Sequence, residues 1–157
     1  SETAIFAAGA DVLEPEFWNV MGDQGVHVIG NPAGLPGKPD TEKSRSFSAA
    51  FQAKFDRPAN AVAMEGYDGV MVIAEAIKAQ KSADPKKIQA GLRELRWEGP
   101  RGEIYFSQDK EPGWMFQQWP DVPIFVIQYS EANQSPKDAA ILWPKGQATV
   151  DEIVLKP

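Results

Sequence analysis

Residues 64–78, with the sequence MEGYDGVMVIAEAIK, constrain the fold of this chain more than any other segment. Four apolar residues of the segment recur at helical spacing, and they are Val70, Ile73, Ala74 and Ile77. This pattern predicts a helix that buries one apolar face and leaves Glu75 and Lys78 in water. Such a helix needs a sheet to pack against. The sequence predicts a buried parallel strand at 4–9, a helix at 14–21 and a second strand at 26–30.

A loop at 31–40 contains three prolines and two glycines, a composition that excludes a helix or a central strand. Three further helices are expected, at about 41–55, at about 61–80 and from Asp84 onwards. Asp84 precedes Pro85, so its side chain is expected to cap the first turn. Three further strands are expected, at 103–106, 124–129 and 140–143.

Aromatic residues suggest where the core lies. Phe47, Phe51 and Phe55 recur every fourth residue, which predicts a stripe that faces the core. Trp114 and Trp119 lie in an irregular segment, where they could cap a cleft or dock a missing half of the protein. The sequence leaves both roles open.

The order of these segments resembles one family. The phenylalanine stripe is followed by Glu65-Gly66-Tyr67-Asp68, by Asp84-Pro85 with Ile88 and Leu92, and by Trp97-Glu98-Gly99-Pro100-Arg101-Gly102 leading to Phe106. This ordered set is similar to the type I periplasmic solute-binding proteins of branched-chain amino acid ABC importers, over nearly all of the 157 residues.

The resemblance implies an α/β fold with parallel-sheet, three-layer lobes, of which this chain would contain only the C-terminal half. Residues 1–36 would form the end of one lobe, and 37–120 would form part of the other. Residues 121–157 would supply a crossover strand and a C-terminal return. A missing N-terminal half, or a second chain, would then complete the fold.

The same resemblance implies a function. The expected protein is an extracytoplasmic receptor that captures a small polar molecule, an amino acid or a related carboxylate, and delivers it to an ABC permease in the membrane. A periplasmic location follows from the resemblance alone. A ligand-sensing regulator or receptor ectodomain with the same fold is the alternative.

Polar residues follow the two N-terminal strands. Ligands of open parallel sheets bind beyond the carboxyl ends of the strands, so Ala10, Asp11, Asn31 and Pro32 are expected at that edge. The resemblance implies that Asp11 and Asn31 contact the ligand, although the family's usual carboxylate for an ammonium group is absent at Asn31 and Pro32. Asp11 or Glu65 would then have to neutralise such a group. Asp11 equally fits a local role at a loop or helix start.

Glu65 and Tyr67 flank Gly66 near the start of the helix at 61–80. A tyrosine offers an apolar ring and a hydroxyl, which suits a ligand cleft, and the resemblance implies that Tyr67 is a pocket aromatic. Alternatively, Tyr67 belongs to the core and Glu65 is a carboxylate favoured by the helix dipole. Asp68 is expected to be structural. The predicted ligand-binding residues are thus Asp11, Asn31, Glu65 and Tyr67.

Composition and missing motifs exclude several other functions. The net charge of −6 and the scattered lysines offer no basic stripe, so nucleic acid is not an expected partner. The chain has no cysteine, and its one histidine, His27, is expected within a strand, so neither a metal site nor a cysteine nucleophile is predicted. Nucleophile-elbow, dinucleotide and phosphate-loop motifs are absent. We therefore expect no enzymatic activity and no cofactor. The apolar runs are too short to span a bilayer.

Overall fold

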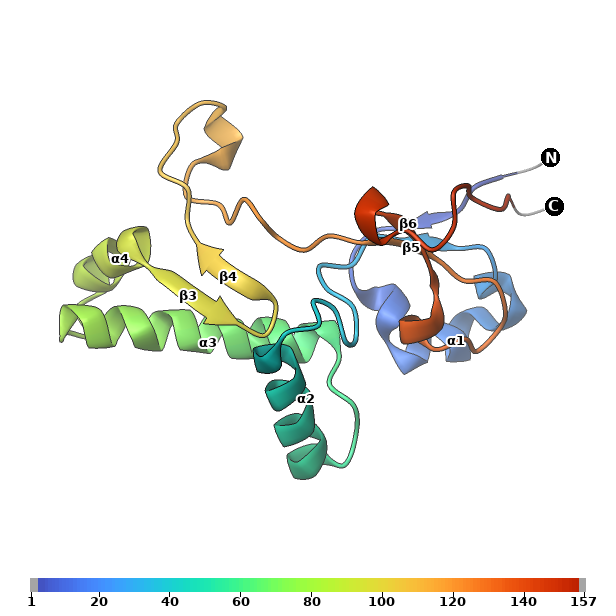
Figure 1. Cartoon of the computed structure of the whole chain (residues 1–157), viewed down its shortest axis with the longest axis horizontal. Helices are drawn as coiled ribbons and strands as arrows, with labels where there is room; N and C mark the ends of the chain where they lie inside the picture. The colour runs from blue at the N-terminus through green and yellow to red at the C-terminus, as the bar shows by residue number, and fades with distance from the viewer. Residues whose placement is uncertain (1–2, 156–157) are drawn as a thin grey trace. The chain divides into compact units, whose positions relative to one another are not determined.

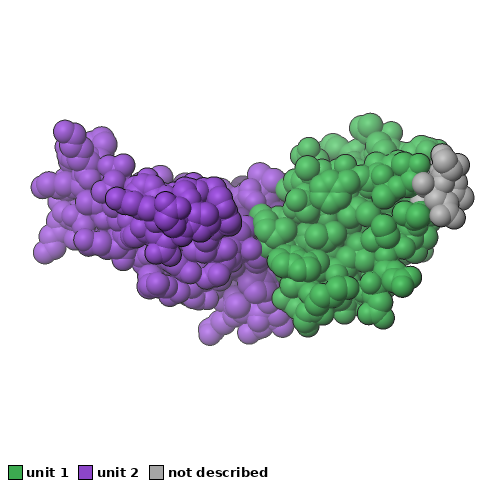
Figure 2. Space-filling model, turned by 90° about the horizontal axis from the view of Figure 1, so that it is seen from above, with its two compact units in different colours: residues 1–37, 124–157 green, residues 38–123 purple. Residues whose placement is uncertain are grey.

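The computed structural model describes residues 3–155, which divide into two compact units (Figures 1 and 2). Unit 1 consists of the described residues up to Gly37 and from Ile124 onwards, and unit 2 consists of Lys38–Pro123. The loop at 31–40 carries the chain out of unit 1 and into unit 2.

Unit 1 is built on a four-stranded sheet with the order β1–β2–β5–β6. β1 (Phe6–Ala7) and β2 (Ile29–Gly30) are parallel. β5 (Val126–Gln128) is antiparallel to β2, and β6 (Ala140–Trp143) is antiparallel to β5. One helix, α1 (Pro15–Met21), connects β1 to β2 through short 3₁₀ turns. The predicted α/β class is confirmed, with a sheet that combines parallel and antiparallel pairs.

Tyr129 lies at the centre of the unit 1 core. Its ring is fully buried against Phe17 and Trp18 of α1, with ring centroids 5.7 and 4.8 Å away. Its hydroxyl donates a hydrogen bond of 2.6 Å to the carbonyl of Val12, and burial raises the pKa of Tyr129 to about 12. Gly30 passes so close to Val12 that an added Cβ would lie 2.5 Å from Val12 Cγ2. This position therefore requires glycine.

Unit 2 contains three α-helices, one short 3₁₀ helix and one β-hairpin among its described residues (Figure 1). The helices are α2 (Glu42–Phe55), α3 (Ala61–Gln80) and α4 (Pro85–Glu94). The hairpin pairs β3 (Arg96–Gly99) antiparallel with β4 (Gly102–Tyr105). Figure 1 shows α4 and the hairpin lying along α3.

Side-chain caps fix the starts of these helices. Thr41, Asn60 and Asp84 each accept a hydrogen bond from a backbone amide in the first turn, which satisfies donors that have no partner inside the helix. Asp84 accepts from both Lys86 and Lys87. The three predicted helices and the Asp84 cap are confirmed, because capping depends only on local sequence.

The predicted buried face of α3 is wrong. Apart from Ala61 at the first position, the buried residues recur every fourth residue, and they are Met64, Asp68, Val72 and Ala76. In contrast, Val70 is 67% exposed and Ile73 is 47% exposed. Gly91 of α4 packs so closely on α3 that an added Cβ would lie 3.2 Å from the carbonyl oxygen of Ala76. α4 thus covers the Ala76 side, and no described segment of unit 2 buries Val70.

The phenylalanine stripe of α2 is not a buried core. Phe47 and Phe51 are half-buried, and Phe55 is 51% exposed. The rings instead contact one another, with centroids 5.8 Å apart for Phe47 and Phe51 and 4.6 Å apart for Phe51 and Phe55. Helical spacing predicts which residues share a face but not whether another segment covers that face.

Two strand predictions needed correction, and one strand was not predicted at all. Of the run at 4–9 only Phe6–Ala7 forms a parallel strand, and Phe6 is 57% exposed on this edge strand of the sheet, so the strand is not buried as predicted. His27 lies in a turn before β2, with a positive φ of 66°, and not within a strand. β3 was missed because Arg96 and Glu98 give it no apolar alternation.

Candidate functional site

The parallel pairing of β1 and β2 brings the segments that follow them to one edge of the unit 1 sheet. Asn31 follows β2, and its Oδ1 accepts a hydrogen bond of 2.8 Å from the backbone amide of Gly9, which follows β1. Asn31 therefore ties the two loops together. Asp11 begins the 3₁₀ helix Asp11–Leu13, where it is exposed.

Asp11 also lines an apolar hollow of about 570 Å³ on unit 1. Apolar residues supply most of its lining, and they are Ile5, Ala7, Phe17, Val20, Met21 and Val28. Glu14 and Glu16 contribute two further carboxylates. An apolar surface beside carboxylates can accept a molecule that has an apolar body and a cationic group.

In unit 2, Tyr67 lines a hollow of about 400 Å³ formed by α2, α3 and β3. Its ring centroid lies 5.0 Å from that of Phe47 and 6.2 Å from that of Trp97. Tyr67 is 41% exposed, so the described part of the chain does not enclose it. Lys43 and Glu75 line the same hollow, which thus combines aromatic walls with a cation and an anion.

Glu65 belongs to an ion cluster around Arg101 that sequence reasoning missed. Arg101 Nε donates to Asp68 Oδ2 at 2.7 Å, and Nη1 donates to Glu65 Oε1 at 3.2 Å. The side chains of Arg101 and Asp68 are 10% and 2% exposed, whereas that of Glu65 is 40% exposed. The ring of Trp119 lies 5.2 Å from the guanidinium carbon. The available signal was the spacing of Glu65 and Asp68, which places both on one face of α3.

Asp68 is the most deeply buried charge of this cluster. Burial raises the pKa of Asp68, the hydrogen bond and charge of Arg101 lower it, and the charge of Glu65 raises it. Its Oδ1 has no hydrogen-bond partner among the described residues. Gly99 brings the hairpin close, because an added Cβ there would lie 2.7 Å from this oxygen. The buried ion pair thus joins the turn of the hairpin to α3.

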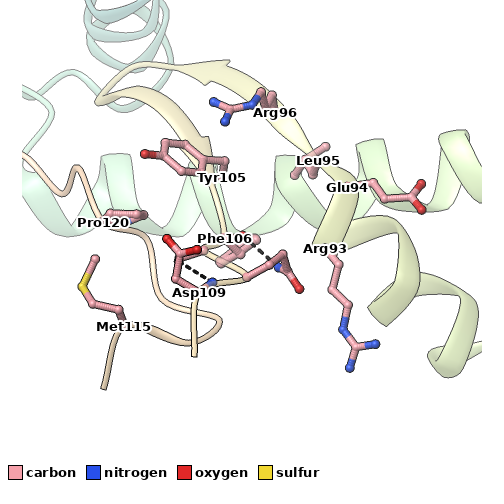
Figure 3. A pocket seen from close by; sticks show the side chains of 11 residues that line it. Arg93, Glu94, Leu95, Arg96, Tyr105, Phe106, Asp109, Met115 and Pro120 are labelled. Carbon is pink, nitrogen blue, oxygen red and sulfur yellow. Dashed lines mark hydrogen bonds between the residues drawn. The ribbon is translucent and has the colours of Figure 1, made fainter. Parts of the chain in front are cut away.

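A separate hollow of about 380 Å³ lies between the end of α4, the hairpin and the segment after β4 (Figure 3). None of the four predicted site residues is among the described residues that line it. Two side-chain hydrogen bonds help to hold the loop in its wall. The Gln108 side-chain amide donates to the Phe106 carbonyl at 2.9 Å, and the Asp109 backbone amide donates to Ser107 Oγ at 3.0 Å. Its lining also contains Arg93 and Arg96.

Within residues 3–155, no group of three or more His, Asp or Glu side chains is arranged to hold a metal ion. None of the helices in the same range is both long and apolar enough to cross a membrane.

The sequence of this chain matches a known protein family. Residues 4–133 match the family described as periplasmic binding protein. The leucine-, isoleucine-, valine-, threonine- and alanine-binding protein of Pseudomonas aeruginosa is 33% identical over 66 residues, which cover 42% of this chain and 18% of that protein.

Solved structures share the fold. A leucine-binding protein from Thermotoga maritima has a TM-score of 0.64 at 20% identity, over 87% of this chain and 36% of that one. A branched-chain amino acid transporter substrate-binding protein from Streptococcus pneumoniae, in complex with isoleucine, has a TM-score of 0.63 at 16% identity, over 99% and 38% of the two chains. A solute-binding protein of an ABC transporter from Rhodopseudomonas palustris, in complex with 3,4-dihydroxybenzoic acid, has a TM-score of 0.57 at 24% identity, over 80% and 32%.

This chain therefore spans about a third of the length of the solved structures that it matches, between 32% and 38% for the three named here. The family match, in contrast, covers most of the chain. The resemblance seen in the sequence is confirmed: the chain belongs to the periplasmic binding protein family.

Proposed function

We propose that this chain is part of an extracytoplasmic receptor that captures a small polar molecule, an amino acid or a related carboxylate, for an ABC importer. The observation that carries this proposal is the family match over residues 4–133. The ligands named for the relatives support the ligand class, and they are leucine, isoleucine, valine, threonine, alanine and 3,4-dihydroxybenzoic acid. The partner would be an ABC permease in the membrane, and the location would be the periplasm.

We propose that Asp11, Asn31, Glu65 and Tyr67 are the residues of this chain that form the ligand-binding site. Asp11 and Tyr67 each line a hollow, and Glu65 is the accessible carboxylate of the Arg101 cluster. Asn31 would act by fixing the loop after β1. Tyr67 offers an exposed ring of the kind that contributes strongly to binding.

A second polypeptide segment, an N-terminal half or another chain, would complete the fold. Val70 and Ile73 of α3 and Phe6 of β1 support this proposal because they are large apolar residues that the described chain leaves exposed. We expect the chain alone to associate or aggregate through these surfaces. Sedimentation and calorimetry provide the test, and a monodisperse monomer with one cooperative unfolding transition would contradict the proposal.

The function is tested in the complete receptor. A thermal-shift screen of the standard amino acids and of aromatic carboxylates should identify at least one stabilising ligand. Calorimetry with that ligand should then show that Tyr67→Ala weakens binding by about 1–3 kcal/mol, the range for loss of a buried aromatic contact. Unchanged affinity would assign Tyr67 a structural role. If only aromatic carboxylates stabilise the receptor, the amino acid ligand is wrong and the transport function remains.

A further inference from the structure

The ion cluster of unit 2 identifies one more residue for the ligand site, an inference that rests on the function proposed above. We propose that Arg101 is a positioning residue, which holds the Glu65 carboxylate in place as the anion that receives a cationic group of the ligand. The hydrogen bond of 3.2 Å from Arg101 Nη1 to Glu65 Oε1 is the contact that would do this.

The charges of the cluster define the ligand class. Two carboxylates face one guanidinium, so one negative charge is unbalanced. Asp68 is buried and bound to Arg101 at 2.7 Å, which leaves Glu65 as the only carboxylate of the cluster that solvent or a ligand can reach. A cation that leaves water needs such a partner, because an unpaired buried charge is very costly. The cluster therefore suits a small molecule with an ammonium group.

The surroundings of Arg101 explain how it can hold Glu65 still. The planar guanidinium directs Nε at Asp68 and Nη1 at Glu65 in a fixed geometry, which a lysine ammonium cannot reproduce. The Trp119 ring lies over the guanidinium at 5.2 Å, and the ring nitrogen is itself anchored to the Glu103 carbonyl at 2.9 Å. A carboxylate that is already fixed loses less side-chain freedom when the ligand binds.

The experiment measures the preference for an ammonium group. In the complete receptor, calorimetry compares L-leucine with 4-methylpentanoate, which has the same apolar body and carboxylate but no ammonium group. We expect the wild type to prefer leucine and Glu65→Gln to lose most of that preference. Arg101→Lys keeps the net charge of the cluster, yet we expect it to reduce the preference about tenfold while affinity for 4-methylpentanoate changes less than about twofold.

Two variants make the comparison specific. Arg96→Lys is the matched control, because Arg96 forms an exposed ion pair with Glu103 outside the cluster, and the preference should not change. Glu65→Asp keeps the charge but shortens the reach to Arg101, so it should show the same selective loss as Arg101→Lys. It also provides the test if Arg101→Lys does not fold.

Several results would overturn the proposal. The first is a wild type that does not prefer leucine over 4-methylpentanoate. The second is an Arg101→Lys variant that keeps the full preference, and the third is an Arg101→Lys variant that binds both probes more weakly by the same factor. If the wild type binds neither probe, leucine is not the ligand of this receptor. A double-mutant cycle of Arg101→Lys and Glu65→Gln, measured by urea unfolding, then tests whether the Arg101–Glu65 contact itself contributes to stability. Non-additivity of about fivefold in the unfolding constant supports it, and additivity refutes it.

Discussion

Replacing Arg101 with methionine should strongly destabilise unit 2. The substitution keeps the length of the apolar stem but removes the charge that Asp68 contacts at 2.7 Å. Asp68 is 2% exposed, so its carboxylate cannot turn to water. Breaking a buried ion pair in this way costs about 3–5 kcal/mol. We expect a loss of that size in the free energy of unfolding at pH 7.

The loss should depend on pH in a defined direction. Burial already raises the pKa of Asp68 above the ordinary 3.8, and Arg101 supplies both of the effects that lower it. Without Arg101 the pKa of Asp68 rises further. A carboxyl group with a raised pKa in the folded state favours folding when protonated, and this contribution is lost as the pH rises through that pKa. The destabilisation should therefore shrink as the pH falls from 7 towards 4.

Urea denaturation of the complete protein between pH 4 and 7 measures both effects. The double variant Arg101→Met with Asp68→Asn has no buried carboxylate, so its deficit should vary little with pH. Arg96→Met provides a surface control, because the exposed pair with Glu103 should be worth less than about 1 kcal/mol. A large deficit of Arg101→Met that does not change with pH would refute the explanation by an unpaired Asp68 charge.

Three further substitutions test the packing of each unit. Tyr129→Phe leaves the buried Val12 carbonyl without its hydroxyl donor, so urea denaturation should show a loss of about 1–3 kcal/mol at pH 7. Since burial raises the pKa of Tyr129 to about 12, the wild type should lose stability as the pH rises from 10 to 12. The Tyr129→Phe variant has no hydroxyl to titrate, so this pH-dependent loss should be absent from it. Gly30→Ala places a Cβ about 2.5 Å from Val12 Cγ2, and we expect a melting-temperature decrease equivalent to about 1–3 kcal/mol. Asp84→Ala removes the cap of α4, and hydrogen exchange at Lys86 and Lys87 should speed up with a loss of about 0.5–2 kcal/mol.

Features that depend on neighbouring residues were predictable from the sequence. The limits of α3, the cap at Asp84 and the break at the loop 31–40 follow from periodicity, capping side chains and proline chemistry. The alignment of β1 with β2 also followed, because a short strand–helix–strand segment has one common arrangement. Family membership followed from the order of such segments along the chain.

Burial was not predictable from the sequence, because it depends on which segments return to cover a face. The apolar spacing of Val70 and Ile73 correctly predicted a helix face, yet α4 covers the opposite side that contains Ala76. For the same reason the phenylalanine stripe of α2 is only half-buried. Periodicity defines a face of a helix, and only tertiary contacts decide whether the face is buried.

The sequence by itself predicted the helices, the Asp84 cap and the α/β class. It also suggested the candidate residues Asp11, Asn31, Glu65 and Tyr67, whose roles stay predictions. Only the tertiary structure showed that Glu65 shares Arg101 with Asp68, because Arg101 lies more than 30 positions along the chain from both carboxylates. Charges so far apart in sequence meet only when the turn of the hairpin packs on α3. Burial makes this ion pair strong and pH-sensitive, since a charge that is removed from water must be stabilised by the partner that the fold places beside it.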